Sequence, residues 1–311
     1  MRKIPAAVAA ALVLVACGCA SEKPVVPVPT ASAAPRPAVT SISVAPTPQP
    51  AGAPPVVGVK VDQYGTGYLD VNNSDSLGNY NYTGFDVGIA TYLSQKLFGQ
   101  DPAFLPVSSA TRETYLADGA VRFFAATYTI DQGRQKEFDL AGPYLVTAQG
   151  VMVGPHSPPI TSLLDLNGKT VCVVGNGSES ESILTQFVPS AHAEPANDYS
   201  DCLNELRDND VQAFSTDLAI LYGYMEQPGN AGLRVVPGVT MGNPIFYGVA
   251  FRKSDYTLCM AAAAQIKALA DSDEWDSFFT SDLGDYASDV SDYQAEVKPT
   301  DQEIKDNSCK N

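Results

Sequence analysis

The feature that most constrains the fold is an ordered alternation of apolar β-rich runs, glycine turns and amphipathic helical patterns. The run 56–61 is followed by a glycine loop and a polar loop, after which Phe85 opens a helical pattern. Thr83 and Asp86 stand at the spacing of a capping box, which predicts an N-cap just before this helix. Further predicted elements are a strand at 104–107, a helix at 112–116 and a strand at 121–126. Such alternation is typical of an α/β unit with a mainly parallel sheet.

A second series of the same kind follows. A strand is predicted at 170–174, and a glycine turn at 175–178 precedes a helix that carries Leu184. The later predicted elements are a helix around Cys202, a strand at 211–214, a helix after Asp217, a strand at 247–251 and a helix at 256–269. Two α/β units of this size leave a crevice outside the carboxyl ends of their strands, where ligands usually bind.

The first residues have the pattern of a bacterial export signal. Arg2 and Lys3 precede an apolar stretch that is too short to span a bilayer comfortably, and this stretch ends in the Leu-Val-Ala-Cys pattern of a lipobox at Cys17. We therefore expect residues 1–16 to be a signal peptide and Cys17 to carry a lipid. Lipidation at Cys19 and an ordinary cleaved signal peptide are the alternatives.

Residues 17–55 combine the lipidated cysteine with a segment rich in Pro, Ala, Val, Thr and Ser and nearly free of charge. The segment has neither helical nor strand periodicity, and its prolines disfavour regular pairing. It is therefore expected to be an extended tether with polyproline II character. A tether behind a lipid holds a globular domain close to the outer face of the cell membrane, so the expected location is extracytoplasmic.

The charge balance argues against some classes of function. The sequence has 19 Lys and Arg against 35 Asp and Glu, which gives a formal net charge of −16. Such a chain is poorly suited to bind nucleic acid or to adhere directly to anionic lipid. An anionic ligand would need a locally positive pocket. The acidic segment 271–306 is expected to be solvated surface.

Four cysteines fall in the part of the chain that is expected to be globular, and they are Cys172, Cys202, Cys259 and Cys309. An even number in an exported protein favours disulfides, and four cysteines allow three pairings. Free buried thiols are the alternative. We expect no metal site, because no two of these cysteines have ligand spacing and the only histidines are His156 and His192.

Five motifs, in order, resemble the amino-acid-binding family of ABC-transporter solute-binding proteins, of the glutamate/glutamine type (bacterial extracellular solute-binding family 3). They are Thr-Gly-Phe-Asp-Val-Gly-Ile-Ala at 83–90, Ala-Thr-Tyr-Thr-Ile-Asp-Gln-Gly-Arg at 126–134, Phe-Asp-Leu-Ala-Gly-Pro-Tyr at 138–144, Asp-Leu-Asn-Gly-Lys at 165–169 and Phe-Ser-Thr-Asp at 214–217. One of these motifs alone is weak evidence, whereas five in order over 56–279 are specific. The anchor, tether and cysteine placement resemble those of actinobacterial lipoproteins.

The resemblance implies an α/β, two-lobed periplasmic-binding-protein-like fold of type II, with a two-strand hinge and the ligand in the inter-lobe cleft. The first lobe is expected to comprise 56–146 plus 241–311, and the second 147–240. The pairing Cys172–Cys202 and Cys259–Cys309 is favoured, because each bond then closes within one lobe.

The function implied by the resemblance is capture of a polar amino acid for an ABC importer. Glutamate and aspartate are favoured, and glutamine and asparagine are possible ligands. The protein is expected to be a monomer without a cofactor. The alternative is a ligand-loaded sensor that docks on a membrane signalling receptor.

A free amino acid presents a carboxylate and an ammonium, so its site needs one cation and one anion. The resemblance assigns the carboxylate to Arg134, whose guanidinium can pair with two oxygens at once. It assigns the ammonium to Asp217. Arg134 could instead be a surface residue of an exposed helix start, and Asp217 could be an ordinary N-cap.

Other polar groups are expected around the ligand. Thr127 and Thr129 alternate along one stretch, so they face the same side and can offer hydroxyl and backbone groups. Either could instead be a simple β-forming residue. Gly177 and Ser178 are expected to present backbone N–H groups at a helix N-terminus, which suits an anion.

Selectivity for an acidic side chain is expected to depend on Lys60, Ser109 and Arg112, which align with basic and polar contacts of acidic-amino-acid binders. Lys60 and Arg112 could instead be ordinary solvated charges. Phe85 and Tyr64 could each be a cleft wall or a core residue, and for Phe85 the core is favoured because it opens a helix.

An enzyme is the less favoured class. Neither histidine lies in the five motifs, no Ser/His or Cys/His arrangement is evident, and no Glu is expected in the stretches that line the cleft. A purely structural lipoprotein leaves the positions of Arg134 and Asp217 unexplained. The sequence therefore predicts a binding protein and not an enzyme.

Overall fold

The computed structural model describes residues 52–74 and 80–310, all of which belong to one compact unit. The expected signal peptide (1–16), the expected lipid site Cys17 and all but the last four residues of the expected tether (17–55) lie outside the described residues. Within the described part, no helix has the length and apolar character that crossing a membrane requires.

The architecture is α/β, and a nine-stranded sheet runs through both of its lobes. In the first lobe, β1 (Val56–Val59) pairs in parallel with β5 (Ala103–Pro106) and β6 (Phe123–Phe124). In the second lobe, β8 (Thr170–Val174) pairs in parallel with β9 (His192–Ala196) and β10 (Ala213–Asp217). The strand order is β5-β1-β6-β12-β7-β10-β8-β9, in which β7 is Phe138–Val153 and β12 is Met241–Arg252, and β11 (Arg234–Val235) pairs with β7.

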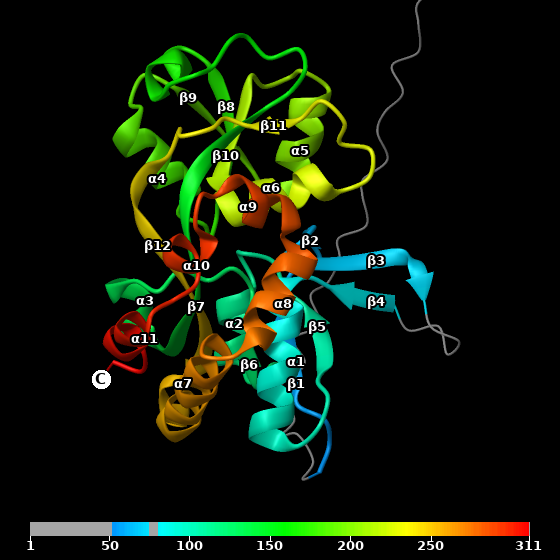
Figure 1. Ribbon diagram of the computed structural model, residues 1–311, viewed down its shortest axis with the longest axis vertical. Helices are drawn as coiled ribbons and strands as arrows, with labels where there is room; N and C mark the ends of the chain where they lie inside the picture. Colours follow the sequence, from blue (N-terminus) through cyan, green and yellow to red (C-terminus); the bar gives the residue numbers. More distant parts are fainter. Residues whose placement is uncertain (1–51, 75–79, 311) are drawn as a thin grey trace, which may run out of the picture. The chain divides into compact units, whose positions relative to one another are not determined.

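Two long antiparallel strands connect the lobes and form the expected two-strand hinge. They are β7 (Phe138–Val153) and β12 (Met241–Arg252), which pair from Phe138↔Arg252 to Gln149↔Met241. The first half of β7 lies in the lower lobe of Figure 1, and its second half pairs with β10 in the upper lobe. The proposed lobe boundaries at 146/147 and 240/241 fall within or next to these strands.

Helices cover the sheet in both lobes (Figure 1). The helices of the first lobe are α1 (Phe85–Phe98), α2 (Arg112–Ala117), α3 (Gln132–Glu137), α7 (Tyr256–Ala270), α8 (Asp273–Asp282) and the short η2 (Lys253–Asp255). Those of the second lobe are η1 (Leu163–Leu166), α4 (Ser180–Phe187), α5 (Tyr199–Arg207) and α6 (Leu218–Glu226). The strand predicted at 170–174 and the helix predicted at 256–269 are confirmed almost to the residue.

A second, three-stranded antiparallel sheet occupies the region where a polar loop was expected. It comprises β2 (Asp62–Gln63), β3 (Gly67–Ser74) and β4 (Tyr80–Thr83). The predicted capping box is wrong, because Thr83 belongs to β4 and Gly84 is the N-cap of α1. Gly84 has φ 115°, and an added Cβ would lie 2.5 Å from the carbonyl group of Thr66, so this turn requires glycine.

The core of the first lobe is rich in aromatic rings. Phe85 is fully buried and packs edge-on against Trp275 and Phe279, so it is a core residue, as favoured. Tyr64 is only partly buried, and its ring lies 5.2 Å from that of Tyr68.

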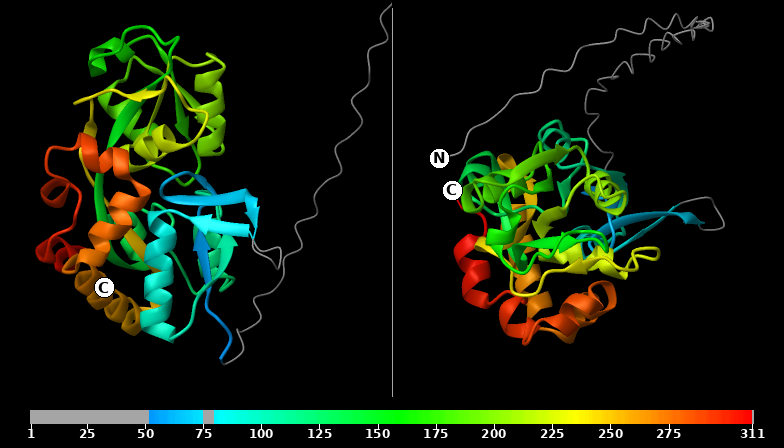
Figure 2. Two further views of the ribbon diagram at one scale, coloured as in Figure 1. Left: turned by 45° about the vertical axis from the view of Figure 1, so that its right-hand side comes forward. Right: turned by 90° about the horizontal axis from the view of Figure 1, so that it is seen from above.

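The acidic C-terminal segment is not simply solvated surface, and that expectation is wrong. After α8 the chain forms α9 (Gly284–Asp289), α10 (Tyr293–Glu296) and α11 (Asp301–Asn307). These helices and α8 bury six hydrophobic residues, which are Trp275, Phe279, Leu283, Tyr286, Val297 and Ile304. The ring of Tyr286 in α9 stacks on Tyr222 of α6, so this segment extends from the first lobe to the second (Figure 2).

Both favoured disulfides are formed. Cys172–Cys202 joins β8 to α5 with a Cα–Cα distance of 5.4 Å. Cys259–Cys309 joins α7 to the end of the chain with a Cα–Cα distance of 6.0 Å.

Candidate functional site

An enclosed pocket lies between the lobes, at the carboxyl ends of the parallel strands. It is lined by Arg112, Thr127, Thr129 and Arg134 from the first lobe, by Ser178, Glu179, Ser180, Tyr199 and Asp217 from the second, and by Ile245 of β12. Six of these residues were predicted from the sequence. The side chains nearly fill the pocket and leave a cavity of about 10 Å³, so the lobes are closed on one another.

Arg134 points into this pocket and is not an exposed surface arginine, because its side chain is only 13% exposed. Asp131 caps α3 and accepts hydrogen bonds from the N–H groups of Gly133 and Arg134, which fixes the helix start. The guanidinium donates to the carbonyl oxygens of Thr129 (3.0 Å) and Gly177 (3.1 Å). It also lies 3.5 Å from a carboxylate oxygen of Glu179 in the opposite lobe.

Arg112, the first residue of α2, is a second buried guanidinium beside Arg134. It donates to the carbonyl oxygens of Ala126 and Thr127 and, across the cleft, to that of Gly177 at 2.7 Å. Both guanidinium groups lie over the Tyr128 ring, at 4.6 Å for Arg112 and 4.2 Å for Arg134. The Nε of Arg112 is buried and finds no hydrogen-bond partner among the described residues. The pocket thus offers two arginines to an anionic group.

Asp86 holds the backbone of Thr127, and sequence reasoning missed this role. Thr127 has φ 46°, and its N–H donates to Oδ2 of Asp86 at 2.7 Å. Tyr144 donates its hydroxyl to the other carboxylate oxygen at 2.8 Å. Burial raises the pKa of Asp86 to about 7. A non-glycine residue at positive φ is strained, so these bonds offset a local cost at the pocket wall.

Asp217 ends β10 and precedes α6, but its side chain makes no capping hydrogen bond. It accepts instead a 2.5 Å hydrogen bond from the hydroxyl of Tyr247 on β12. Burial raises the pKa of Asp217 to about 6. Because this pKa is still below 7, Asp217 is mostly ionised at neutral pH, and its carboxylate lines the pocket, where it can attract a cation.

Gly177 and Ser178 differ from what was expected. The N–H of Ser178 donates to the carbonyl of Gly175, and α4 begins only at Ser180, so the expected N–H site at Ser178 is wrong. Gly177 presents its carbonyl oxygen to both arginines. It has φ 79°, and an added Cβ would lie 2.1 Å from the carbonyl oxygen of Ser109, so the lobes touch here through backbone.

Lys60 and Ser109 lie behind the pocket wall. The ammonium of Lys60 donates to Oγ of Ser109 at 2.6 Å and lies 4.9 Å from the centre of the Tyr199 ring. Lys60 is 1% exposed, so it is not a solvated surface charge. Burial, with the neighbouring charge of Arg112, lowers the pKa of Lys60 to about 7.

Four lining residues were missed, namely Glu179, Ser180, Tyr199 and Ile245, and two of them, Tyr199 and Glu179, interact with the opposite lobe. Tyr199 is buried at the start of α5, and its hydroxyl interacts with Ser109 of the first lobe and Ser178 of the second. Glu179 lines the pocket, so the expectation that no Glu would line the cleft is wrong. The signal for Glu179 was its position directly after the glycine turn. Tyr199 depends on a long-range contact and has no comparable signal.

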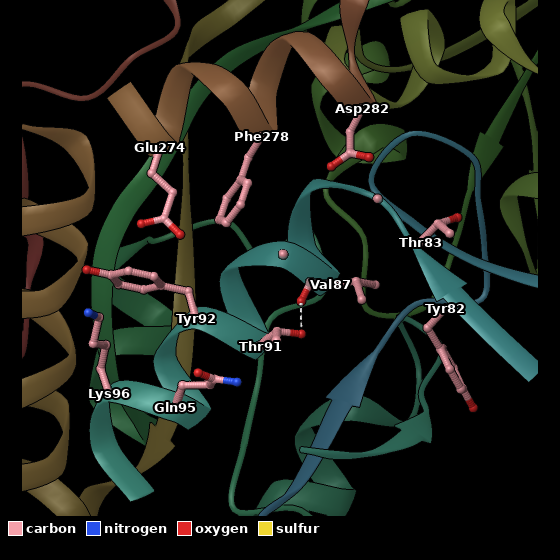
Figure 3. A pocket seen from close by; sticks show the side chains of 12 residues that line it. Tyr82, Thr83, Val87, Thr91, Tyr92, Gln95, Lys96, Glu274, Phe278 and Asp282 are labelled. Carbon is pink, nitrogen blue, oxygen red and sulfur yellow. Dashed lines mark hydrogen bonds between the residues drawn. The ribbon is translucent and has the colours of Figure 1, made fainter. Parts of the chain in front are cut away.

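A larger groove of about 540 Å³ lies on the first lobe alone, between α1, α8 and the end of β4 (Figure 3). Its walls include Tyr82, Tyr92 and Phe278, with the carboxylates of Glu274 and Asp282 on α8. It shares no lining residue with the pocket between the lobes. The smaller pocket is the candidate site, because charges of both signs converge there from both lobes.

Comparison with known proteins identifies the family. The sequence pattern of the bacterial extracellular solute-binding proteins, family 3, matches residues 56–281. The chain belongs to this family. It is thereby placed among extracellular solute-binding proteins, and its type II two-lobed fold is that of its structural relatives.

Individual relatives agree with this assignment. The glutamate-binding protein GluB of Corynebacterium efficiens is 30% identical over 238 residues, which cover 74% of this chain and 78% of that protein. The glutamine-binding protein GlnH of Bacillus subtilis is 28% identical over 198 residues, which cover 63% of this chain and 71% of that protein. Among solved structures, an ancestral arginine-binding protein bound to glutamine has 27% identity and a TM-score of 0.64, with coverage of 74% of this chain and 97% of that one. The solute receptor for L-cysteine of Neisseria gonorrhoeae has 25% identity and a TM-score of 0.68, with coverage of 79% and 96%.

Proposed function

We propose that this protein captures a free polar amino acid between its lobes and delivers it to an ABC importer, with glutamate and aspartate as its preferred ligands. One observation carries the proposal: Arg134 and Asp217, which come from opposite lobes, line the same enclosed pocket. A zwitterionic amino acid needs one cation and one anion at a fixed separation, and such a pocket offers both.

In this proposal Arg134 pairs with the α-carboxylate and Asp217 with the α-ammonium. The planar guanidinium fork suits two carboxylate oxygens. Glu179, 3.5 Å from Arg134, competes for the same guanidinium, so we infer that it moves when the carboxylate binds. Thr127 and Thr129, which line the pocket beside the arginines, are proposed to add polar contacts.

Selectivity is proposed to come mainly from Arg112. It is the second guanidinium of the pocket, and its buried Nε has hydrogen-bonding capacity left. The side-chain carboxylate of a bound glutamate or aspartate makes a stronger hydrogen bond to this guanidinium than the side-chain amide of glutamine or asparagine does. Lys60, one layer behind through Ser109, adds part of a positive charge at neutral pH without lining the pocket. The relatives named for glutamate and glutamine support a ligand of this size.

Capture is proposed to work by a population shift between open and closed lobes. Ligand contacts to both lobes exist only in the closed form, so the ligand favours that form by its differential affinity. The β7–β12 pair provides the hinge. A lipid at Cys17 is proposed to keep the domain at the outer face of the membrane, beside the importer.

The test is a thermal-shift panel with each of the twenty amino acids, on purified protein shown to be folded and free of carried-over ligand. At a ligand concentration near a thousand times Kd, the folded state gains about 4 kcal/mol. This corresponds to a midpoint shift of about 8–16 °C for a chain of this size. We expect the largest shifts with glutamate and aspartate, and smaller ones with glutamine and asparagine.

Two results would contradict parts of the proposal. A shift only with glutamine or with a basic amino acid would retain the amino-acid site and refute the selectivity of Arg112. No shift with any of the twenty would refute an amino-acid ligand altogether.

A further inference from the structure

A short segment of the first lobe grips the second lobe outside the ligand pocket. The carboxylate of Asp62 accepts a 3.0 Å hydrogen bond from the backbone N–H of Tyr199, at the start of α5. The backbone carbonyl of Asp62 accepts a 2.6 Å hydrogen bond from the hydroxyl of Tyr224 in α6. One residue of the first lobe thus bonds to two helices of the second.

The next residues of the segment touch α6 through backbone. An added Cβ on Gly223 would lie 1.9 Å from the carbonyl oxygen of Tyr64. Gly65 has φ 81°, and a Cβ there would lie 2.8 Å from the Cα of Gly223. Side chains at either glycine would therefore keep the segment and the helix apart.

The polar partners in this contact depend on closed lobes. The N-cap residue of α5, Asp198, makes no side-chain capping bond, so Asp62 of the other lobe supplies an acceptor to the first turn of α5. Tyr224 is 1% exposed, and its hydroxyl bonds to the first lobe. Opening the lobes would separate both donors from these acceptors.

The glycine at position 223 serves the contact between the closed lobes and not the stability of α6. It lies inside α6 (Leu218–Glu226), where alanine favours the helix more than glycine does. The three atoms nearest to its Cβ position all belong to Tyr64 and Gly65. A helix that never met this segment would gain from alanine at this position.

We propose that Asp62, Tyr64, Gly65, Gly223 and Tyr224 form an interlobe latch that sets ligand affinity without touching the ligand. None of the five lines the pocket. They are positioning residues, because they act on the ligand only by stabilising the closed form around Arg134 and Asp217. The latch rests on the proposed capture of an amino acid.

The decisive variant is Gly223→Ala, with Gly88→Ala as its matched control. Gly88 is also a helical glycine, in α1, where a Cβ would lie at 3.4 Å from the Phe278 ring, an ordinary contact. Both variants are measured in the full protein with L-glutamate, and with L-aspartate and L-glutamine as further probes. We expect Gly223→Ala to raise Kd at least tenfold while the variant stays folded, with an unchanged circular dichroism spectrum. Gly88→Ala should leave Kd within twofold of the native protein.

Kinetics and a milder variant separate the latch from general damage. The ligand enters while the lobes are open and the latch is broken, so Gly223→Ala should increase the dissociation rate and leave the association rate nearly unchanged. Tyr224→Phe removes only the hydroxyl bond, and we expect Kd to rise about 2- to 12-fold. Asp62→Asn keeps an acceptor for the N–H group at the start of α5, so this variant should bind L-glutamate more tightly than Asp62→Ala.

Wild-type affinity in folded Gly223→Ala would overturn the latch. If the native protein binds none of the amino acids, the proposed function fails, and the latch is tested on ligand-free protein by small-angle X-ray scattering. It predicts a larger radius of gyration for Gly223→Ala than for Gly88→Ala. Equal radii would overturn it independently of any ligand.

Discussion

Arg112 and Arg134 bring two guanidinium groups to the same carbonyl oxygen, that of Gly177, and over the same ring, that of Tyr128. Like charges this close repel one another in a low dielectric, and burial together with the charge of Arg134 lowers the pKa of Arg112. Backbone carbonyl groups offset part of this repulsion. An anion between the two arginines would offset more of it, which supports the carboxylate ligand proposed above.

At the residue scale, we predict that Arg134→Lys weakens glutamate binding almost as much as Arg134→Ala does. Lysine keeps the charge but loses the planar fork that pairs with two oxygens and stacks on Tyr128. We expect each variant to raise Kd for glutamate at least a hundredfold in calorimetric titration, with an unchanged circular dichroism spectrum. Near-native affinity in Arg134→Lys would show that only the charge matters, and near-native affinity in Arg134→Ala would remove this residue from the site.

Asp217 gives a second prediction, on pH. Burial raises the pKa of Asp217 to about 6, and only the ionised form attracts an ammonium. Affinity is therefore fully present above the raised pKa and falls as pH drops through it. We expect Kd for glutamate to rise about tenfold between pH 7.5 and pH 5, because ionisation changes tenfold per pH unit below the pKa. In Asp217→Asn the binding should be weaker and this pH dependence much smaller, and a retained dependence would assign the titration to another group.

Among the elements, those with a local pattern were predictable from the sequence. β8 and α7 were located because an apolar run and a helical face are visible within a few residues. β7 was not, because its 16 residues contain Gly142 and Pro143 and its main partner, β12, lies about a hundred residues further along the chain. β3 and β4 were missed because many of their residues are polar, and even the apolar Val71 of β3 is 60% exposed.

The same distinction applies to the site. Arg134, Thr129 and Asp217 were found because each sits in a short motif. Asp86 and Tyr199 were missed because their roles depend on partners 41 and 90 residues away, Thr127 for Asp86 and Ser109 for Tyr199. No local spacing predicts such contacts.

An element-scale prediction concerns the end of the chain. Cys309 bonds to α7, its N–H donates to the carbonyl of Leu140 in β7, and Ser308 exchanges two hydrogen bonds with Gly142. We expect Cys259→Ala/Cys309→Ala to lower the free energy of unfolding by about 4 kcal/mol, the loop-closure value for a 50-residue separation. Denaturant unfolding measures the loss, and limited proteolysis should locate new cleavage beyond residue 283. An unfolding midpoint equal to that of the native protein would contradict a stabilising role for this bond.

For the molecule as a whole, buried carboxyl groups make stability depend on pH. Burial raises the pKa of Asp86 to about 7, and those of Asp217 and Asp282 to about 6. The folded chain therefore binds more protons than the unfolded chain between about pH 4 and pH 7. This contribution to stability is fully present below the ordinary carboxyl pKa and is lost as pH rises through the raised values. The lowered pKa of Lys60 acts in the other direction, but above pH 7.

We therefore predict that the ligand-free protein melts at a higher temperature at pH 5 than at pH 7.5, by a few degrees. The net charge of −16 adds to the trend, because self-repulsion weakens as carboxylates are protonated. Calorimetric scans measure the midpoint, and Asp86→Asn should reduce the difference between the two pH values. A higher midpoint at pH 7.5 than at pH 5 would show that other ionised groups outweigh these three.

Trp275, the single tryptophan of the sequence, connects the hinge to the pocket through a chain of hydrogen bonds. Its indole N–H donates to the carbonyl of Tyr144 in β7 at 2.8 Å, and the hydroxyl of the same tyrosine holds Asp86, which holds Thr127 at the pocket wall. Its ring stacks on Phe279 and lies beneath the ammonium of Lys298. The protein thus contains an intrinsic fluorophore, and the wavelength and intensity of its tryptophan emission can report bending of the hinge without an attached dye.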